Sequence, residues 1–60
     1  MLTITIYGEA FQCDRVEKGA NFIKVYLDGK LILENSGIID FSGYNLVDEN
    51  GNPATYDNVQ

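Results

Sequence analysis

Short alternating apolar segments, separated by single glycines, dominate the first half of the chain. From Leu2 onwards, apolar residues at even positions alternate with threonines at odd positions, which is typical of a half-buried β-strand. Gly8-Glu9 has the pattern of a type II′ hairpin turn, and Asp28-Gly29 has that of a type I′ turn. We therefore expect antiparallel strands at about 2–7, 10–16, 22–27 and 30–35.

These turns predict a register in which one face collects the apolar side chains. Ile4 then lies opposite Cys13, Arg15 lies opposite Ile23, and Val25 lies opposite Ile32. The expected core residues are Leu2, Ile4, Ile6, Phe11, Cys13, Ile23, Val25, Leu27 and Ile32.

The sequence therefore predicts an all-β fold, a four- to five-stranded antiparallel meander with a short fifth strand at 44–47. Either this meander curls into a small SH3-like barrel or it remains an open sheet. We expect a single β domain over residues 1–47, followed by a turn and a loosely ordered C-terminal tail over residues 48–60.

The chain lacks the covalent and metal cross-links that stabilise many small domains. It has 60 residues, so its core is thin. Cys13 is its only cysteine and it has no histidine, which excludes an internal disulfide and a zinc site of the usual kind. Self-association or a protein partner is the source of stability left open.

The charge of the chain disfavours two classes of partner. Four basic and nine acidic residues give a formal net charge of −5. Four scattered cations do not neutralise a run of phosphates, so we expect no nucleic-acid partner and no binding to an anionic membrane. No signal peptide or apolar membrane span is visible, and we expect a cytoplasmic protein, or a virion-associated one if it derives from a phage.

No residue pattern indicates catalysis, a cofactor or a metal. The commonest general base is absent, and Cys13 alternates with Phe11 on the expected core face, so we interpret it as a packed thiol. The segment Asp48–Asn52 differs from a calcium loop because its glycine is in the fourth place and no closing glutamate follows. We expect a non-enzyme with no catalytic, cofactor-binding or metal-binding residue.

The second face of the predicted sheet is more apolar than a solvent-facing surface should be. The residues that gather there form the candidate interface: Tyr7, Phe22, Tyr26, Leu31 and Leu33. Leu31 is expected opposite Tyr26, and Leu33 opposite Lys24. Monomers seldom expose a contiguous apolar patch, so either a protein partner covers it, a second copy of the chain covers it, or residues 41–47 fold back over it.

Five segments resemble short β proteins of unassigned function that are encoded in bacteriophage and prophage gene clusters. They are Ile4-Thr5-Ile6-Tyr7-Gly8, Cys13-Asp14, Phe22-Ile23-Lys24-Val25-Tyr26, Ser36-Gly37-Ile38 and Asp40-Phe41-Ser42-Gly43-Tyr44. The resemblance implies a phage or mobile-element origin and protein–protein contact, and it carries over no functional residue.

Two functional classes follow from these expectations. The first is a non-catalytic structural or protein-interaction module that acts through the apolar patch, as a homo-oligomer or with another protein. The alternative is a small acidic inhibitor of the DNA-mimic type, which presents carboxylates to a basic nucleic-acid-binding protein. The acidic residues relevant to it are Glu9, Asp14, Glu17, Asp28, Glu34, Asp40, Asp48 and Glu49.

Overall fold

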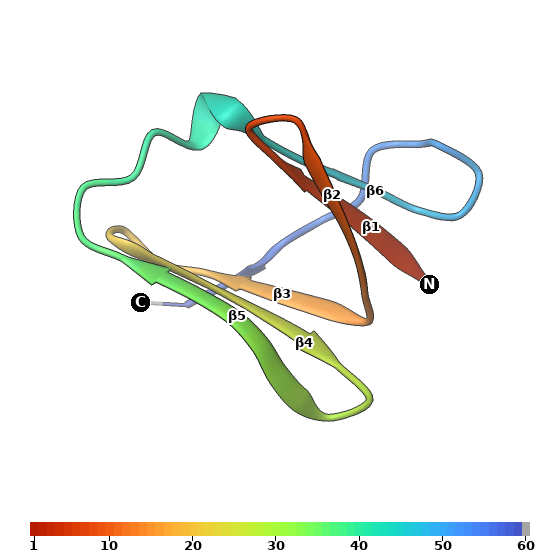
Figure 1. The fold of residues 1–60 in the computed structure, drawn as a ribbon, viewed down its shortest axis with the longest axis horizontal. Coiled ribbons are helices and arrows are strands. Elements are labelled where there is room, and N and C mark those ends of the chain that lie inside the picture. Colours follow the sequence, from red (N-terminus) through yellow and green to blue (C-terminus); the bar gives the residue numbers. More distant parts are fainter. Residues whose placement is uncertain (60) are drawn as a thin grey trace.

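The computed structural model describes residues 1–59, which form two β-sheets with one apolar core between them (Figure 1). We call them sheet A, with strand order β2-β1-β6, and sheet B, with strand order β5-β4-β3-β7. The strands are β1 Leu2–Ile6, β2 Glu9–Cys13, β3 Arg15–Lys18, β4 Phe22–Leu27, β5 Lys30–Ser36, β6 Tyr44–Val47 and β7 Asp57–Asn58. The all-β class is confirmed. Over residues 1–59 no strand pairing joins the two sheets, so the chain forms neither a closed barrel nor one open sheet.

The β1–β2 hairpin turns one residue earlier than the sequence predicts. Its two turn residues are Tyr7 and Gly8, not Gly8 and Glu9, and both have positive φ (49° and 88°), as in a type I′ turn. Ile4 consequently lies opposite Phe11, two positions away from the expected partner. Because two is an even shift, the apolar side chains still face the core.

A bend at Asp14 divides the segment predicted as a single second strand into β2 and β3. At this bend the chain passes from sheet A to sheet B (Figure 1). The backbone N–H of Asp14 donates to the Tyr26 carbonyl at 2.8 Å, and the Asp14 carboxylate accepts the backbone N–H of Asp28. Cys13 and Val16 are both buried although they are three residues apart, which a straight strand does not allow.

The bend also changes the register between β3 and β4. Arg15 lies opposite Tyr26, not opposite Ile23 as predicted, and Val16 lies opposite Val25. The shift is odd, so Val16 points into the core and Arg15 points outward.

The β4–β5 hairpin has the predicted Asp28-Gly29 turn and starts in the predicted register. A β-bulge then inserts Ile32, so that Leu33 lies opposite Val25. Ile32 is 45% exposed, whereas Leu33 packs against the core. The predictions that Ile32 belongs to the core and that Leu33 belongs to the second face are therefore wrong.

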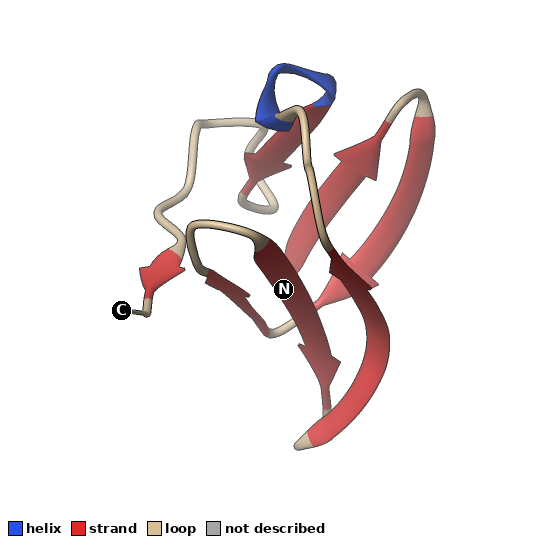
Figure 2. Ribbon diagram, turned by 90° about the vertical axis from the view of Figure 1, so that its left-hand side faces the viewer, coloured by secondary structure: helices blue, strands red, loops and turns tan. Residues whose placement is uncertain are grey.

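The chain returns to sheet A through one 3₁₀ turn, η1 Phe41–Gly43 (Figure 2). Asp40 precedes this turn, and its carboxylate accepts the backbone N–H of Ser42 at 3.0 Å and the Ser42 hydroxyl at 2.7 Å. Strand β6 then pairs with β1 on the side opposite β2, which confirms the predicted fifth strand at 44–47.

Residues after Val47 pair with both sheets, although the sequence predicts a loose tail there. Pro53 forms an isolated bridge with Val47, and β7 pairs in parallel with β3. The side chains of Ala54 and Tyr56 pack against the core. Gln60, the last residue of the predicted tail, lies outside the described residues.

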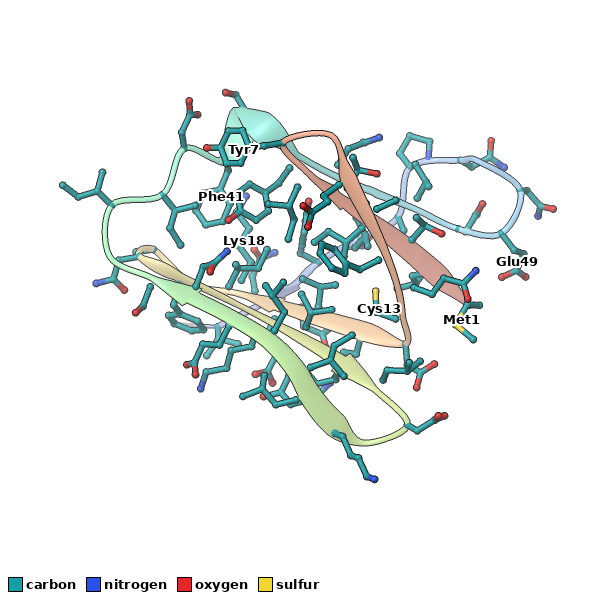
Figure 3. All side chains as sticks on the ribbon, viewed as in Figure 1. Met1, Tyr7, Cys13, Lys18, Phe41 and Glu49 are labelled. Atoms are coloured by element: carbon teal, nitrogen blue, oxygen red, sulfur yellow. The ribbon has the colours of Figure 1, made fainter. Side chains whose placement is uncertain are left out.

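Six buried side chains form the core between the sheets, and Cys13 among them is labelled in Figure 3. They are Ile4, Cys13, Val16, Ile23, Val25 and Leu46. Four of these were predicted. Val16 joins them because of the bend at Asp14, and Leu46 because β6 pairs with β1. Leu2, Ile6 and Phe11 are partly buried against the same cluster.

Candidate functional site on the outer face of sheet B

The outer face of sheet B is the face that points away from the core. Along β3 and β4 its residues alternate with buried ones, and the strand pairing places residues of β5 and β7 beside them. They are Arg15, Glu17, Phe22, Lys24, Tyr26, Leu31, Glu34, Ser36 and Asp57.

Tyr26 lies near the centre of this face and is half-buried under charged neighbours. Its hydroxyl donates to the Glu17 carboxylate at 3.0 Å, and the Arg15 guanidinium lies 4.5 Å from its ring centroid. Arg15 also forms ion pairs with Glu17 at 3.3 Å and with Asp57 at 3.9 Å. Burial, then the hydrogen bond to Glu17, raises the Tyr26 pKa above its usual value. The hydroxyl is therefore a neutral hydrogen-bond donor at physiological pH.

Phe22 is held against the turn that precedes β4. A Cβ at Gly19 would lie 2.0 Å from the Phe22 ring, so only glycine leaves room for the ring there. The Lys24 ammonium lies 5.5 Å from the ring centroid of Phe22 and 3.8 Å from the Glu34 carboxylate. Part of the apolar surface predicted for Phe22 is thus covered by its own chain.

Leu31 supplies the most exposed apolar surface of this face. It lies opposite Tyr26 and is 47% exposed, and the bulge residue Ile32 follows it, also exposed. Together they form an apolar corner where β5 leaves its turn. Leu33, the third leucine or isoleucine of the run, turns inward after the bulge.

Tyr7 lies away from the outer face of sheet B, at the β1–β2 turn (Figure 3). It is 65% exposed, its ring packs edge-on against Tyr44 at 5.7 Å between centroids, and its hydroxyl donates to the Asp40 carbonyl at 2.8 Å. Burial, then the nearby Asp40 charge, raises the Tyr7 pKa. Of the five predicted interface residues, the structure therefore brings together Phe22, Tyr26 and Leu31.

Residues 41–47 do not fold back over the outer face of sheet B. Phe41, Tyr44 and Leu46, which the sequence offered as a cover, pack against the core cluster between the sheets. Lys18 lies beside them, its ammonium 4.5 Å from the Phe41 ring centroid and 5.2 Å from that of Tyr56 (Figure 3). The side chains available for folding back are thus used elsewhere.

Arg15 is the outer-face residue that sequence reasoning misses, because the predicted register sets it opposite the core residue Ile23. The predicted position of Ile32 in the core is a second error, although no strand pairing places Ile32 on the outer face. The odd spacing of the apolar residues Cys13 and Val16 around Asp14 is the signal that indicates the first error. Nothing in the run Leu31-Ile32-Leu33 shows which of its three apolar residues is the inserted one.

The thiol of Cys13 is enclosed in the core. The side chain is fully buried, and burial, then the neighbouring Asp14 charge, raises the thiol pKa. A thiol in this state is a poor nucleophile.

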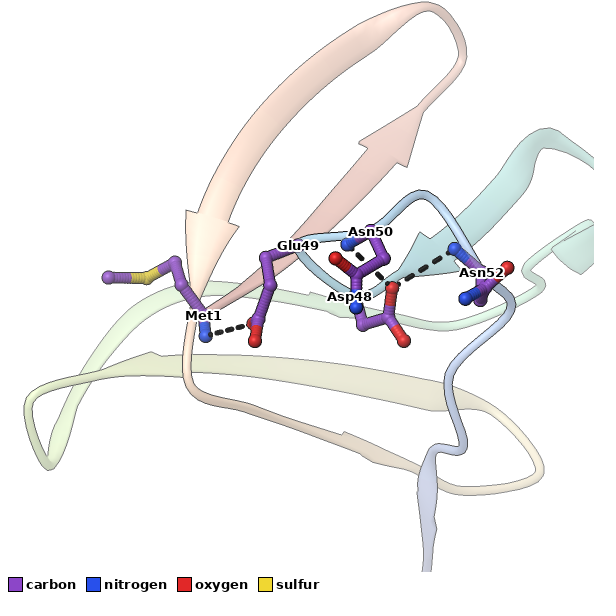
Figure 4. A network of polar contacts seen from close by, with 5 residues as sticks. All are labelled: Met1, Asp48, Glu49, Asn50 and Asn52. Carbon is purple, nitrogen blue, oxygen red and sulfur yellow. Dashed lines mark hydrogen bonds and ion pairs between the residues drawn. The ribbon is translucent and has the colours of Figure 1, made fainter.

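The Asp48–Asn52 segment is a tight turn held by its own carboxylate (Figure 4). The Asp48 carboxylate accepts the backbone N–H groups of Asn50 and Asn52 at 2.8 and 3.0 Å. Next to it, the Met1 ammonium contacts the Glu49 carboxylate at 2.9 Å. Within the described part of the chain, no three potential metal ligands cluster, and no helix is long and apolar enough to cross a membrane.

Comparison of the chain with protein-family models, with curated proteins and with solved structures finds no match.

Proposed function

We propose that this chain is a non-catalytic protein-interaction module that binds through the outer face of sheet B. The observation that carries the proposal is that Tyr26 and Leu31 lie on a face which residues 41–47 leave uncovered. Exposed apolar surface of this kind on a small domain marks an interaction site. The burial of Cys13, the one thiol, supports the non-catalytic part of the proposal.

The arrangement of Tyr26 and Leu31 suits a binding surface. Tyrosine and arginine are enriched in the residues that dominate binding energy, and here Arg15 stacks on Tyr26 next to an exposed leucine. The hydrogen bond to Glu17 and the ion pairs of Arg15 hold both side chains in place before a partner arrives. Less conformational entropy is then lost on binding.

Capture with variant proteins tests this proposal. Wild type, Leu31→Asp and Ile38→Asp would each be immobilised and exposed to an extract of the cells that naturally contain the chain. Ile38 is fully exposed and lies outside the outer face, so Ile38→Asp adds the same charge as the test variant. We expect Leu31→Asp alone to lose the partner. Equal capture by all three proteins, or loss with Ile38→Asp alone, would reject the outer face as the binding surface.

A second candidate function, the acidic inhibitor, draws on a different surface. The Glu49 hydrogen bond, with smaller effects of Asp14 and Asp48, raises the pKa of the Met1 ammonium, so these carboxylates lie near one end of the molecule. Asp28 adjoins Asp14 through its backbone N–H. A basic protein bound at this end should be released by salt and should bind Asp14→Asn more weakly. Release by salt that Asp14→Asn leaves unchanged would argue against it.

A further inference from the structure

Asn50-Gly51 is the only place in the sequence where glycine follows asparagine. Asparagine is among the thermally labile residues, because the backbone nitrogen of the next residue attacks its side-chain carbonyl carbon. A side chain on that next residue hinders the attack, and glycine has none. The other asparagines precede phenylalanine, serine, leucine, proline or valine. Local chemistry therefore makes Asn50 the most reactive asparagine of the chain.

The structure leaves this reactive pair accessible to solvent. Asn50 and Gly51 are both exposed in the turn that follows β6 (Figure 4). Asn35 precedes serine, the next smallest neighbour, but it lies within β5 opposite Ile23, and its amide donates to the Tyr44 hydroxyl at 3.0 Å. Strand pairing and this hydrogen bond restrain Asn35. Asn50 is therefore favoured by its surroundings as well as by its sequence.

The hydrogen bonds of the turn slow this reaction, and Asp48 is their main acceptor. The Gly51 N–H donates to the Asp48 carbonyl at 3.0 Å. The Asp48 carboxylate accepts the backbone N–H groups of Asn50 and Asn52 at 2.8 and 3.0 Å. The Gly51 nitrogen attacks only after it has lost its proton, so its bond to Asp48 must break first. The nearby carboxylate also disfavours the negative charge that this nitrogen then carries. Reaction at Asn50 therefore requires the turn to open.

The same turn joins β6 to the segment that runs back to sheet B. The Asp48 N–H donates to the Asn52 carbonyl at 2.9 Å, and Pro53 forms a bridge with Val47. The Ala54 N–H then donates to a carbonyl of β6 at 3.0 Å. These contacts depend on the length of the loop between Asp48 and Asn52, because the loop sets which backbone groups face each other. An extra backbone atom in the loop would shift this pairing.

From these observations we infer that Asn50 is a site of spontaneous covalent modification, that opening of the turn controls its rate, and that the product weakens the pairing of residues 53–54 with β6. The Gly51 nitrogen bonds to the Asn50 side-chain carbonyl carbon, and the amide group leaves with the Gly51 proton as ammonia. Water then opens the resulting cyclic imide. Cleavage at the side-chain carbonyl gives aspartate, and cleavage at the backbone carbonyl gives isoaspartate. Both products add one negative charge, and isoaspartate adds one carbon atom to the backbone.

Warm incubation at mildly alkaline pH, followed by peptide mass mapping, tests the site. We expect a mass gain of about 1 Da to appear first on the peptide that contains Asn50. Asn50→Gln should abolish this early gain, because the longer side chain closes a less favourable ring. The modified fraction, separated by its extra charge on an anion-exchange column, should have a lower Tm than the unmodified protein. An earlier gain at another asparagine, or an unchanged Tm, would overturn the inference.

Two comparisons test the control of the rate by the turn. Wild type should react several-fold more slowly in buffer than in urea, where the turn is absent. In buffer, Asp48→Ala should react several-fold faster than wild type. Glu49→Ala removes the adjacent carboxylate, which bonds to Met1 and not to the turn, and should react nearly like wild type. Equal rates in buffer and urea, or equal rates of the two variants in buffer, would show that the turn does not control the reaction. If Asp48→Ala has lost its circular dichroism signal, the comparison of wild type in buffer and in urea decides.

Discussion

The two hairpins of the molecule share one turn geometry but stabilise it in different ways. Both two-residue turns have positive φ at both positions, Tyr7-Gly8 at 49° and 88° and Asp28-Gly29 at 53° and 75°. Aspartate tolerates this conformation and tyrosine does so only at a cost in energy. The second turn is therefore specified by its own two residues, whereas the first depends on contacts from elsewhere in the chain.

Those contacts all come from the segment around η1. The backbone N–H of Tyr7 donates to the Gly43 carbonyl at 2.8 Å, its hydroxyl donates to the Asp40 carbonyl, and its ring packs on Tyr44. Strain in the β1–β2 turn and order in the β5–β6 connection are thus coupled. A turn can therefore be predicted from the sequence when its own residues specify it. Where tertiary contacts hold the turn, they can move it by one residue.

Gly43→Ala should produce the largest loss of stability. A Cβ at this position would lie 2.2 Å from the Tyr7 ring, so the ring must leave its place and the strained turn loses its support. We expect about 2–3 kcal/mol less stability in urea unfolding, the upper part of the range for overpacking. In the Tyr7→Ala background the same substitution should have little further effect. An equal loss in both backgrounds would show that the ring contact is not the cause.

Leu33→Ala and Ile32→Ala compare the two sides of the β5 bulge in the second hairpin. Leu33 is partly buried against the core and Ile32 is exposed, so Leu33→Ala should cost about 1.5–2 kcal/mol and Ile32→Ala less than about 0.5 kcal/mol. Urea unfolding of both variants measures the difference. If Ile32→Ala lost more stability than Leu33→Ala, the regular register that the sequence predicts would be correct and the bulge would be wrong.

The sequence predicts those features of the fold that depend on local chemistry. The alternation in β1 and β4 and the Asp28-Gly29 turn place Ile4, Ile23 and Val25 in the core, as observed. The bend at Asp14 carries the chain from one sheet to the other, and the bulge in β5 shifts its pairing with β4 by one residue. The sequence signals the bend only through the odd spacing of Cys13 and Val16, and the apolar run Leu31-Ile32-Leu33 does not show where the bulge falls.

In the candidate site, too, the sequence predicts the residues that lie on regular strands and misplaces those that depend on irregularities or on distant contacts. Phe22 and Tyr26 share a face because β4 is a regular strand, and Leu31 joins them because it precedes the bulge and lies opposite Tyr26. Leu33 was misplaced because it follows the bulge, and Tyr7 because its turn is stabilised by distant residues. The stacking of Arg15 on Tyr26 depends on the register after the Asp14 bend, which differs from the regular register that the sequence predicts.

Asparagine substitutions at the two turns isolate the local part of the comparison. Asparagine adopts positive φ more readily than tyrosine, so a turn limited by local strain alone should be stabilised by Tyr7→Asn. Because the ring and hydroxyl contacts are lost, we expect instead a decrease in Tm of about 5 °C. Asp28→Asn keeps a turn residue, removes a charge near Asp14, and should leave the Tm unchanged or slightly raised. A higher Tm for Tyr7→Asn would mean that the tertiary contacts contribute less than the strain.

The smallest effect should come from Asp40→Asn, which tests the far side of the same contact. The side-chain hydroxyl of Ser42, then its backbone N–H, lowers the pKa of Asp40 below its ordinary value of 3.8. A carboxyl group whose pKa is lowered on folding stabilises the protein above the ordinary pKa, and that contribution disappears as the pH falls through the lowered pKa. We therefore expect Asp40→Asn to lower the Tm by about 2 °C near pH 7 and to match wild type near pH 2. Glu49 also has a pKa lowered by its hydrogen bond to the Met1 ammonium, but it is present in both proteins and cancels from their difference. A Tm difference that stays constant from pH 7 to pH 2 would show that Asp40 acts on the η1 turn without its charge.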